Sequence, residues 1–239
     1  MEGLPVGLEF GLPLPGLDRS DQVIFTNAII TMGILLVFSI LIVRGMSIKK
    51  PTRWQVILEY TIGWLYNTME EVIGKGGGRY LPLIASLFLY VLIGNLIGLV
   101  PGFVSPTSNI SHNLALALIV FFATPVVGIK QVGFKAFMKH RMGPIVALAP
   151  VFFILETVGE FARPVSLTIR LFGNIKGEDI LIAVINRIAG MIYYVPITVV
   201  IIPLALITSF VQALIFALLP TIYFAGAAGW GEEEHGERV

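Results

Sequence analysis

Long apolar runs separated by short polar segments dominate the chain. The first runs from Phe25 to Val43, and others cover residues 81–100 and 114–129. A helix rises 1.5 Å per residue, so about 20 apolar residues cross the roughly 30 Å of hydrocarbon in a bilayer. We therefore predict membrane-spanning helices at 25–43, 81–100 and 114–129.

Residues 52–74 follow a different pattern, in which apolar residues recur at helical spacing between charged ones. Trp54, Ile57 and Leu58 begin the apolar set, and Glu59 and Glu70 lie among its later members. Such a pattern is typical of an amphipathic helix along the membrane interface. The glycine-rich segment that follows lacks the spacing of a phosphate-binding loop and is predicted to be a hinge.

Two longer apolar stretches, 144–185 and 189–226, make up the C-terminal part. The first would measure about 63 Å as a helix, twice the thickness of a bilayer. We predict a hairpin of two long, tilted or kinked helices joined near Asn186 and Arg187. An acidic tail over 227–239 is expected to follow. The predicted fold class is an all-α integral membrane protein with multiple spans.

Composition supports a membrane location. Hydrophobic residues make up 56% of the chain, charged residues 13%, and the mean hydropathy is +0.88, outside the usual range of water-soluble domains. A net charge of +1 offers no basic face for a nucleic acid. The sequence has no cysteine and its histidines are not grouped with other ligands, so neither a metal nor a cofactor is expected.

Basic residues beside the spans predict the orientation. Clusters of Lys and Arg next to a span favour the cytoplasmic side. The N-terminal tail, residues 1–22, is therefore expected outside and the C-terminus in the cytoplasm. The basic residues concerned follow the first and third runs: Arg44, Lys49, Lys50, Arg53, Lys130, Lys135, Lys139 and Arg141.

A stripe of polar residues crosses the apolar stretch 144–185. At 100° per residue, its members fall within about 80° of one another on an ideal helix. A charge in the middle of a membrane costs about 2.5–3.5 kcal/mol, so the stripe needs a partner, water or a function. An alternative is a set of salt bridges that only holds helices together. The stripe consists of Glu156, Glu160, Arg163, Arg170, Asn174 and Glu178, with Asp179 at its flank.

Arg170 lies between the acidic members of the stripe. Carboxylates take up and release protons, whereas a guanidinium stays charged and cannot relay one. This order predicts two acidic half-paths for protons, with Arg170 as a plug between them and a carboxylate of another subunit carrying protons past it. Because Glu178 and Asp179 are adjacent, each is expected to compensate partly for loss of the other.

The segments "RPVSLTIRLFGNIKGED" at 163–179 and "QALIFALLPTIYF" at 212–224 resemble subunit a of the bacterial F-type ATP synthase. The resemblance implies that Arg170 faces a ring of c subunits and that Asn174 and Gln212 are its polar neighbours. It also implies that Asp179 is the outer-channel acid. The expected proton path comprises Glu178, Asp179, Asn174, Gln212, Glu156, Glu160 and Ser166.

Further expectations follow from the same resemblance. The chain would be a stator subunit of a rotary proton motor in the bacterial inner membrane, and it would not be catalytic alone. Its expected partners are the peripheral stalk b subunits, the rest of the ATP synthase and the lipid bilayer. Some family members have a histidine where this chain has Ala205 and a glycine at Glu178, so Glu178 is expected to take over that histidine's role. The alternative function is a self-contained secondary transporter with a buried anion site at Arg170, for which helices broken near Pro164 would be typical.

Overall fold

The computed structural model describes residues 19–45, 53–74, 76–100, 103–141, 149–189 and 198–236. In this part of the chain all regular structure is helical, which confirms the predicted all-α class. The elements are α1 (Arg19–Gly45), α2 (Arg53–Ile73), η1 (Gly77–Tyr80), α3 (Leu81–Gly98), η2 (Pro106–Ser108), α4 (Ile110–Val132), α5 (Phe134–Arg141), α6 (Ala149–Ala189) and α7 (Thr198–Gly236).

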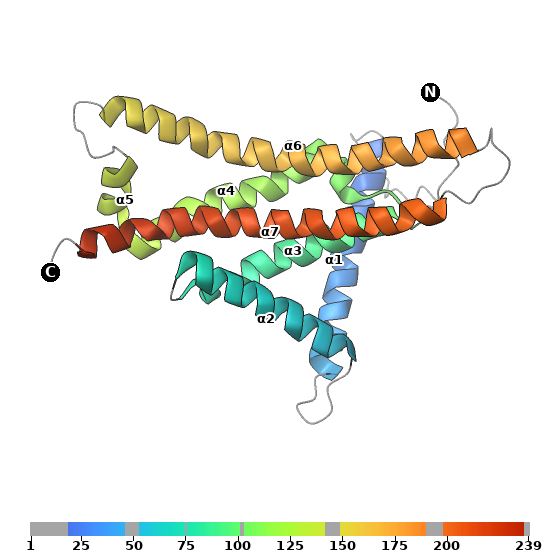
Figure 1. Ribbon diagram of the computed structural model, residues 1–239, viewed down its shortest axis with the longest axis horizontal. Coiled ribbons are helices and arrows are strands. Elements are labelled where there is room, and N and C mark those ends of the chain that lie inside the picture. The colour runs from blue at the N-terminus through green and yellow to red at the C-terminus, as the bar shows by residue number, and fades with distance from the viewer. Residues whose placement is uncertain are drawn as a thin grey trace.

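The long helix α7 organises the molecule. It packs against α2, α3, α4 and α6, and Figure 1 shows α6 and α7 extending along the whole length of the fold with α4 beside both. Helix α1 contacts α3 and η2. Side chains of α2, α3, α4, α6 and α7 fill the apolar core between them. The hairpin is thereby held along one side and is open along the other.

Three helical segments of the described chain are long and apolar enough to cross a membrane: residues 77–98, 110–132 and 202–227. Helix α1 carries a shorter apolar stretch at 22–37. Helix α4 begins at Ile110, four residues before the predicted span, because the Asn109 side chain accepts a hydrogen bond of 2.8 Å from the Ser111 backbone N–H. This cap satisfies a donor that the first turn of a helix otherwise leaves unpaired.

The C-terminal hairpin differs from its predicted bounds at both turns. Helix α6 continues to Ala189, so the expected junction near Asn186 and Arg187 is wrong; no glycine or proline interrupts residues 178–189. Helix α7 continues to Gly236, so most of the expected tail is part of that helix, since glutamate is a good helix former. Helix α6 also passes through Pro164 without a break.

The described glycines between α2 and α3 are held by hydrogen bonds and close packing. Gly76 has a φ of 95°, which glycine adopts without strain. The Glu70 carboxylate accepts hydrogen bonds of 3.3 Å from the backbone N–H groups of Gly76 and Gly78. Gly77 is buried, and a Cβ there would lie 2.7 Å from the Met69 carbonyl oxygen. Close packing therefore fixes the angle at which α3 leaves α2.

Candidate functional site

Arg170 lies on the open side of α6. Its side chain is exposed and makes no hydrogen bond or ion pair with the described residues. The face around it is small: a Cβ added at Gly173 or Gly177 would meet no atom within 4 Å. No contact with a described residue therefore requires these glycines, and small residues on a membrane helix generally allow another helix to approach closely. The other small exposed residues of this face are Gly159, Ala162 and Ser166.

One turn after Arg170, polar side chains join α6 to α7. The Asn174 amide donates a hydrogen bond to the Gln212 side-chain oxygen, and Gln212 is only 2% exposed. Another turn along, the Thr208 hydroxyl donates to the Glu178 carboxylate over 3.4 Å. The structure thus brings together Asn174, Gln212 and Glu178, which the sequence placed in one path.

A cavity of about 270 Å³ opens beside these contacts, between α6 and α7. Asn174, Glu178 and Thr208 supply its polar atoms, and Ala205 lies among its apolar lining. The small side chain of Ala205 leaves room in this cavity next to the Glu178 carboxylate. The cavity therefore places a proton-exchanging group within reach of the hairpin's open side.

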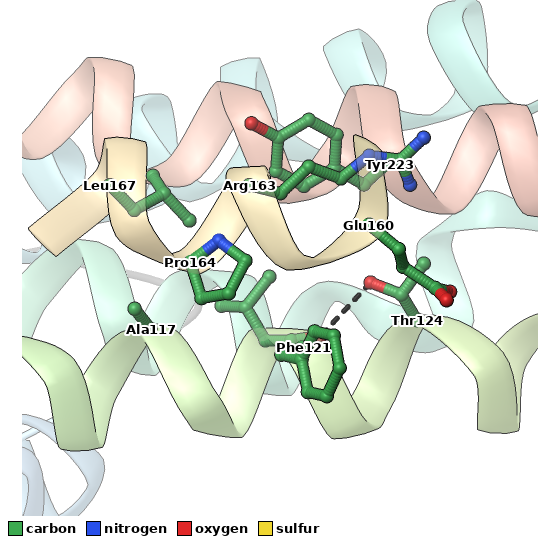
Figure 2. Close-up of a pocket in the computed structure, with 9 residues that line it drawn as sticks. Ala117, Phe121, Thr124, Glu160, Arg163, Pro164, Leu167 and Tyr223 are labelled. Atoms are coloured by element: carbon green, nitrogen blue, oxygen red, sulfur yellow. Dashed lines mark hydrogen bonds between the residues drawn. The ribbon is translucent and has the colours of Figure 1, made fainter. Parts of the chain in front are cut away.

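The inner members of the stripe turn toward different helices. The Arg163 guanidinium lies 4.9 Å from the ring centroid of Tyr223 on α7, and one of its nitrogens is 3.9 Å from a Glu156 oxygen. Figure 2 shows Glu160 pointing instead toward Thr124 on α4. Glu160 is 9% exposed. The salt-bridge alternative therefore fits Arg163 and Glu156, but not Arg170.

A cavity of about 10 Å³ lies among Glu160, Arg163, Tyr223 and Thr124 (Figure 2). A single water molecule needs a space of roughly 10–15 Å³. The cavity lies at the lower end of this range, and its walls expose only apolar atoms, so it offers a water no hydrogen-bond partner. On the side of Arg170 opposite to Glu178, the described structure therefore supplies the Glu160 carboxylate but no polar cavity beside it.

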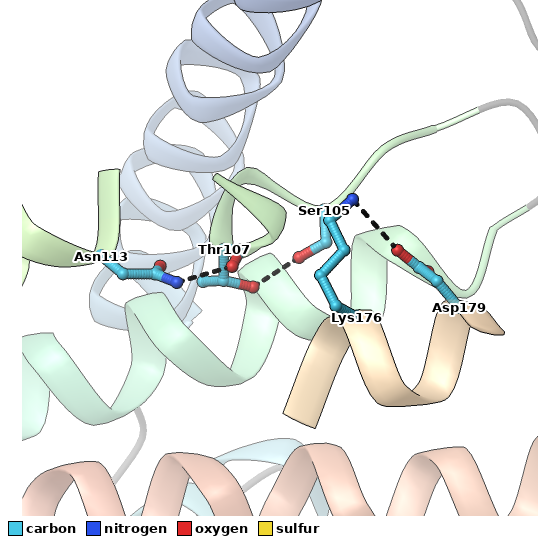
Figure 3. Close-up of polar contacts among 5 residues, drawn as sticks. All are labelled: Ser105, Thr107, Asn113, Lys176 and Asp179. Carbon is cyan, nitrogen blue, oxygen red and sulfur yellow. Dashed lines mark hydrogen bonds and ion pairs between the residues drawn. The ribbon is translucent and has the colours of Figure 1, made fainter. Parts of the chain in front are cut away.

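Asp179 lies apart from Glu178. Its carboxylate is 3.7 Å from the Lys176 ammonium, one turn earlier on α6. Figure 3 shows Lys176 extending toward the segment between α3 and α4, on which Ser105 lies, with Asp179 turned to meet it. Helix α6 packs against this segment at η2. The adjacent acids are therefore directed to different neighbours.

Sequence reasoning missed a buried group of polar residues next to this ion pair, here called the outer polar cluster. The Thr107 hydroxyl donates to the Asn95 side-chain oxygen over 2.7 Å, and the Asn113 amide donates to the Thr107 carbonyl over 2.7 Å. The Ser105 and Thr107 hydroxyls are 2.6 Å apart (Figure 3). The cluster consists of Asn95, Ser105, Thr107, Ser108 and Asn113.

The outer polar cluster is incompletely satisfied. The Asn95 amide nitrogen, the Ser108 hydroxyl and the Asn113 amide oxygen are buried without a hydrogen-bond partner in the described structure. Buried polar groups of this kind are normally paired with water when protein groups do not reach them. The absence of a side chain at Gly98 lets Ser105 pack directly on α3.

His112 contacts Tyr90 of α3 through its imidazole ring. It is half-buried in the first turn of α4, and its Nε2 is 3.0 Å from the Tyr90 hydroxyl. The two rings also contact each other, with centroids 5.7 Å apart. The pair therefore joins α3 to α4 near the outer polar cluster.

A sequence model of the family described as ATP synthase A chain matches residues 25–225 of the chain. That range contains Arg170, both adjacent acids and both hairpin amides. The chain belongs to the ATP synthase A chain family. It is therefore a membrane subunit of the ATP synthase complex, as the resemblance of residues 163–179 implied.

Curated relatives agree with this family and with one another. The chain is 41% identical to ATP synthase subunit a of Geotalea daltonii over 216 residues, 90% of each chain. It is 40% identical to the subunit of the same name from Geobacter sulfurreducens, again over 90% of each chain. The subunit a of Aquifex aeolicus is 38% identical over 90% of this chain and 99% of its own length.

The polar side chains of this member of the ATP synthase A chain family carry oxygen and nitrogen groups, and its carboxylates can take up and release protons. No group of metal-ligating side chains that could hold an ion occurs among the described residues. Carboxylates lie on both sides of Arg170 along α6. Glu178 lines the larger cavity and Glu160 the smaller one, whereas Glu156 is paired with Arg163 and Asp179 with Lys176.

Proposed function

We propose that this chain is the proton-translocating stator subunit of the membrane sector. Two half-paths on either side of Arg170 exchange protons with carboxylates on a rotating ring of c subunits. The observation that carries the proposal is the unpaired, exposed guanidinium on the small face of α6. Against lipid such a charge costs about 2.5–3.5 kcal/mol, so it calls for an anion supplied by a partner.

The spacing along α6 supports separate half-paths. Glu156 precedes Arg170 by fourteen residues, about 21 Å of helix, and Glu178 follows it by eight residues, about 12 Å. Proton transfer requires hydrogen-bond contact, directly or through water. No side chain of the described hairpin joins these acids past Arg170, so a carboxylate that moves across the face of α6 has to complete the route.

The proposed inner half-path comprises Glu156, Glu160 and Ser166. The proposed outer half-path comprises Glu178, Asp179, Asn174 and Gln212, with the outer polar cluster supplying access for water. A ring carboxylate loses its proton to one half-path, pairs with the Arg170 guanidinium, and takes up a proton from the other. Because the guanidinium does not release a proton, the two half-paths stay insulated from each other.

The same proposal covers the orientation and the partners. Lys130 and Lys135 are exposed at the end of α4 and the start of α5, on what the positive-inside tendency makes the cytoplasmic side. The N-terminus then lies outside the bacterial inner membrane, the C-terminus lies in the cytoplasm, and α2 follows the inner interface. Peripheral stalk b subunits are the proposed partners away from the ring.

The secondary-transporter alternative fits the structure less well. A buried anion site at Arg170 would require burial, whereas this side chain is exposed. Transporters of that type use broken helices at the binding site, whereas α6 is continuous through Pro164. We therefore favour a site completed by another subunit.

The test is Arg170→Ala in the assembled ATP synthase, with Arg187→Ala as a control on the same helix. Arg170→Ala should abolish ATP synthesis and ATP-driven proton pumping and leave a passive proton leak. The leak should disappear when the ring carboxylate is also removed, because ring carboxylates carry those protons. Arg187→Ala should stay coupled. Coupled synthesis near the wild-type rate in an intact Arg170→Ala complex would refute the proposed role.

A further inference from the structure

The adjacent acids Glu178 and Asp179 lie on different faces of α6. Glu178 lines the cavity between α6 and α7 and accepts a hydrogen bond from Thr208. Asp179 is not part of that lining and is paired with Lys176 at 3.7 Å. On an ideal helix Lys176 and Asp179 are about 60° apart, whereas Lys176 and Glu178 are about 160° apart.

We infer that Lys176 is a positioning residue of the outer half-path, which holds Asp179 against the segment between α3 and α4. This inference rests on the proposed function. Asp179 then receives the proton on the side of the outer polar cluster, and Glu178 passes it on at the cavity. The two acids act one after the other, which differs from the mutual compensation expected from their adjacency.

The pairing with Lys176 suits the cycle that Asp179 has to complete. A proton from water adds to an Asp179 carboxylate oxygen and leaves again through water to Glu178, while the ammonium keeps its own three protons. The ammonium favours the charged carboxylate, so it returns Asp179 to the state that accepts the next proton. In an apolar surrounding both ions also cost less as a pair than apart.

Geometry gives Lys176 little else to do. It is not part of the cavity lining, it extends toward the segment on which Ser105 lies (Figure 3), and its side chain is 44% exposed within this chain. In the described structure Asp179 is its only ion-pair partner. The long flexible stem lets the ammonium reach Asp179 one turn later, which a shorter polar residue would not do.

The experiment measures ATP-driven proton pumping in inverted vesicles that contain the assembled complex. Lys176→Met should lower the rate of proton pumping by about two- to fivefold, which corresponds to the interaction energy of a partly exposed ion pair. Lys176→Arg, which keeps the positive charge, should pump at the wild-type rate. The exchanged pair Lys176→Asp with Asp179→Lys rebuilds the ion pair but moves the acid by one turn. It should assemble and still pump poorly.

The order of the acids is tested in the same vesicles. Glu178→Gln and Asp179→Asn should each be as severe as the double variant, because a serial path fails at either step. A double variant clearly worse than both single variants, or wild-type pumping by an assembled Lys176→Met complex, overturns the inference. If Lys176→Met does not assemble, Lys176→Gln serves in its place.

The two proposals fail in distinguishable ways. Arg170→Ala is included as the reference for the proposed function. An inactive Arg170→Ala complex beside a fully active Lys176→Met complex removes only the role of Lys176. A coupled Arg170→Ala complex removes the stator mechanism itself.

Discussion

Gly128 offers a quantitative test of how the inner ends of the helices pack. It lies near the end of α4, where Phe137 of α5 covers it; the Phe137 side chain is 2% exposed. A Cβ at Gly128 would lie 2.6 Å from a ring carbon of Phe137 and 3.3 Å from the Ala227 Cβ of α7. Ordinary contact begins at 3.4 Å, so the ring would have to move by about 0.8 Å, the difference between 3.4 and 2.6 Å.

The expected cost of Gly128→Ala follows from this overlap. Overpacking a core costs about 1–3 kcal/mol, and alanine regains about 0.5–1 kcal/mol of helix preference. From the middle of each range, the free energy of unfolding should fall by about 1.25 kcal/mol, which lowers Tm by roughly 2–5 °C at this chain length. Thermal unfolding of the purified complex in detergent measures the change.

Two further variants complete the test. Gly63→Ala on α2 is the matched control, because a Cβ there meets no atom within 4 Å; its Tm should not fall. Phe137→Leu removes the ring that Gly128→Ala strikes, so the double variant should be more stable than the sum of the single effects by about 0.5–3 kcal/mol. Strictly additive effects, or a Gly128→Ala variant as stable as Gly63→Ala, would refute the packing argument.

Two other predictions concern the inner side and the topology. Tyr223→Phe keeps an aromatic face for the Arg163 guanidinium and should pump protons like the wild type, whereas Tyr223→Leu should lose about 0.5–2 kcal/mol of stability and pump less; equal behaviour of the two variants would count against the cation–π contact. Because the chain has no cysteine, Ser111→Cys and Lys135→Cys can be labelled selectively at two exposed positions with an impermeant thiol reagent. Ser111→Cys should react from outside and Lys135→Cys from inside, and labelling of both from one side would contradict the proposed orientation.

Local features of the sequence were sufficient to predict the long apolar helices and to single out Arg170 as a candidate site residue. Apolar runs of about 20 residues already identify spanning helices. A guanidinium within such a run is conspicuous because placing its charge in the membrane is energetically unfavourable. The family resemblance of residues 163–179 rests on contiguous residues, so it also needed no tertiary information. The helix ends were less predictable, since the start of α4 depends on the capping side chain of Asn109.

Contacts between residues far apart in the sequence determine which polar side chains are buried and which neighbours they face, and these features could not be predicted. The polar run after α3 reads as a loop, and only the close packing of Ser105 on Gly98 reveals that it is buried. Glu160 and Arg163 lie in the same polar stripe on an ideal helix, but in the structure Glu160 lies next to α4 and Arg163 contacts α7. Likewise, only the positions of Thr208 and Lys176 show that Glu178 and Asp179 have separate neighbours.

The small residues around Arg170 also have a mechanical consequence. Packed helices normally interlock, because rows of side chains on one fit between rows on the other, and sliding then requires one row to climb over the next. The exposed glycine, alanine and serine residues from Gly159 to Gly177 form a shallow strip along α6, although Phe161, Val165 and Ile169 are also exposed on this stretch. Under the proposed function, a partner that moves sideways across the strip has few rows to climb there and meets low steric friction around the Arg170 side chain.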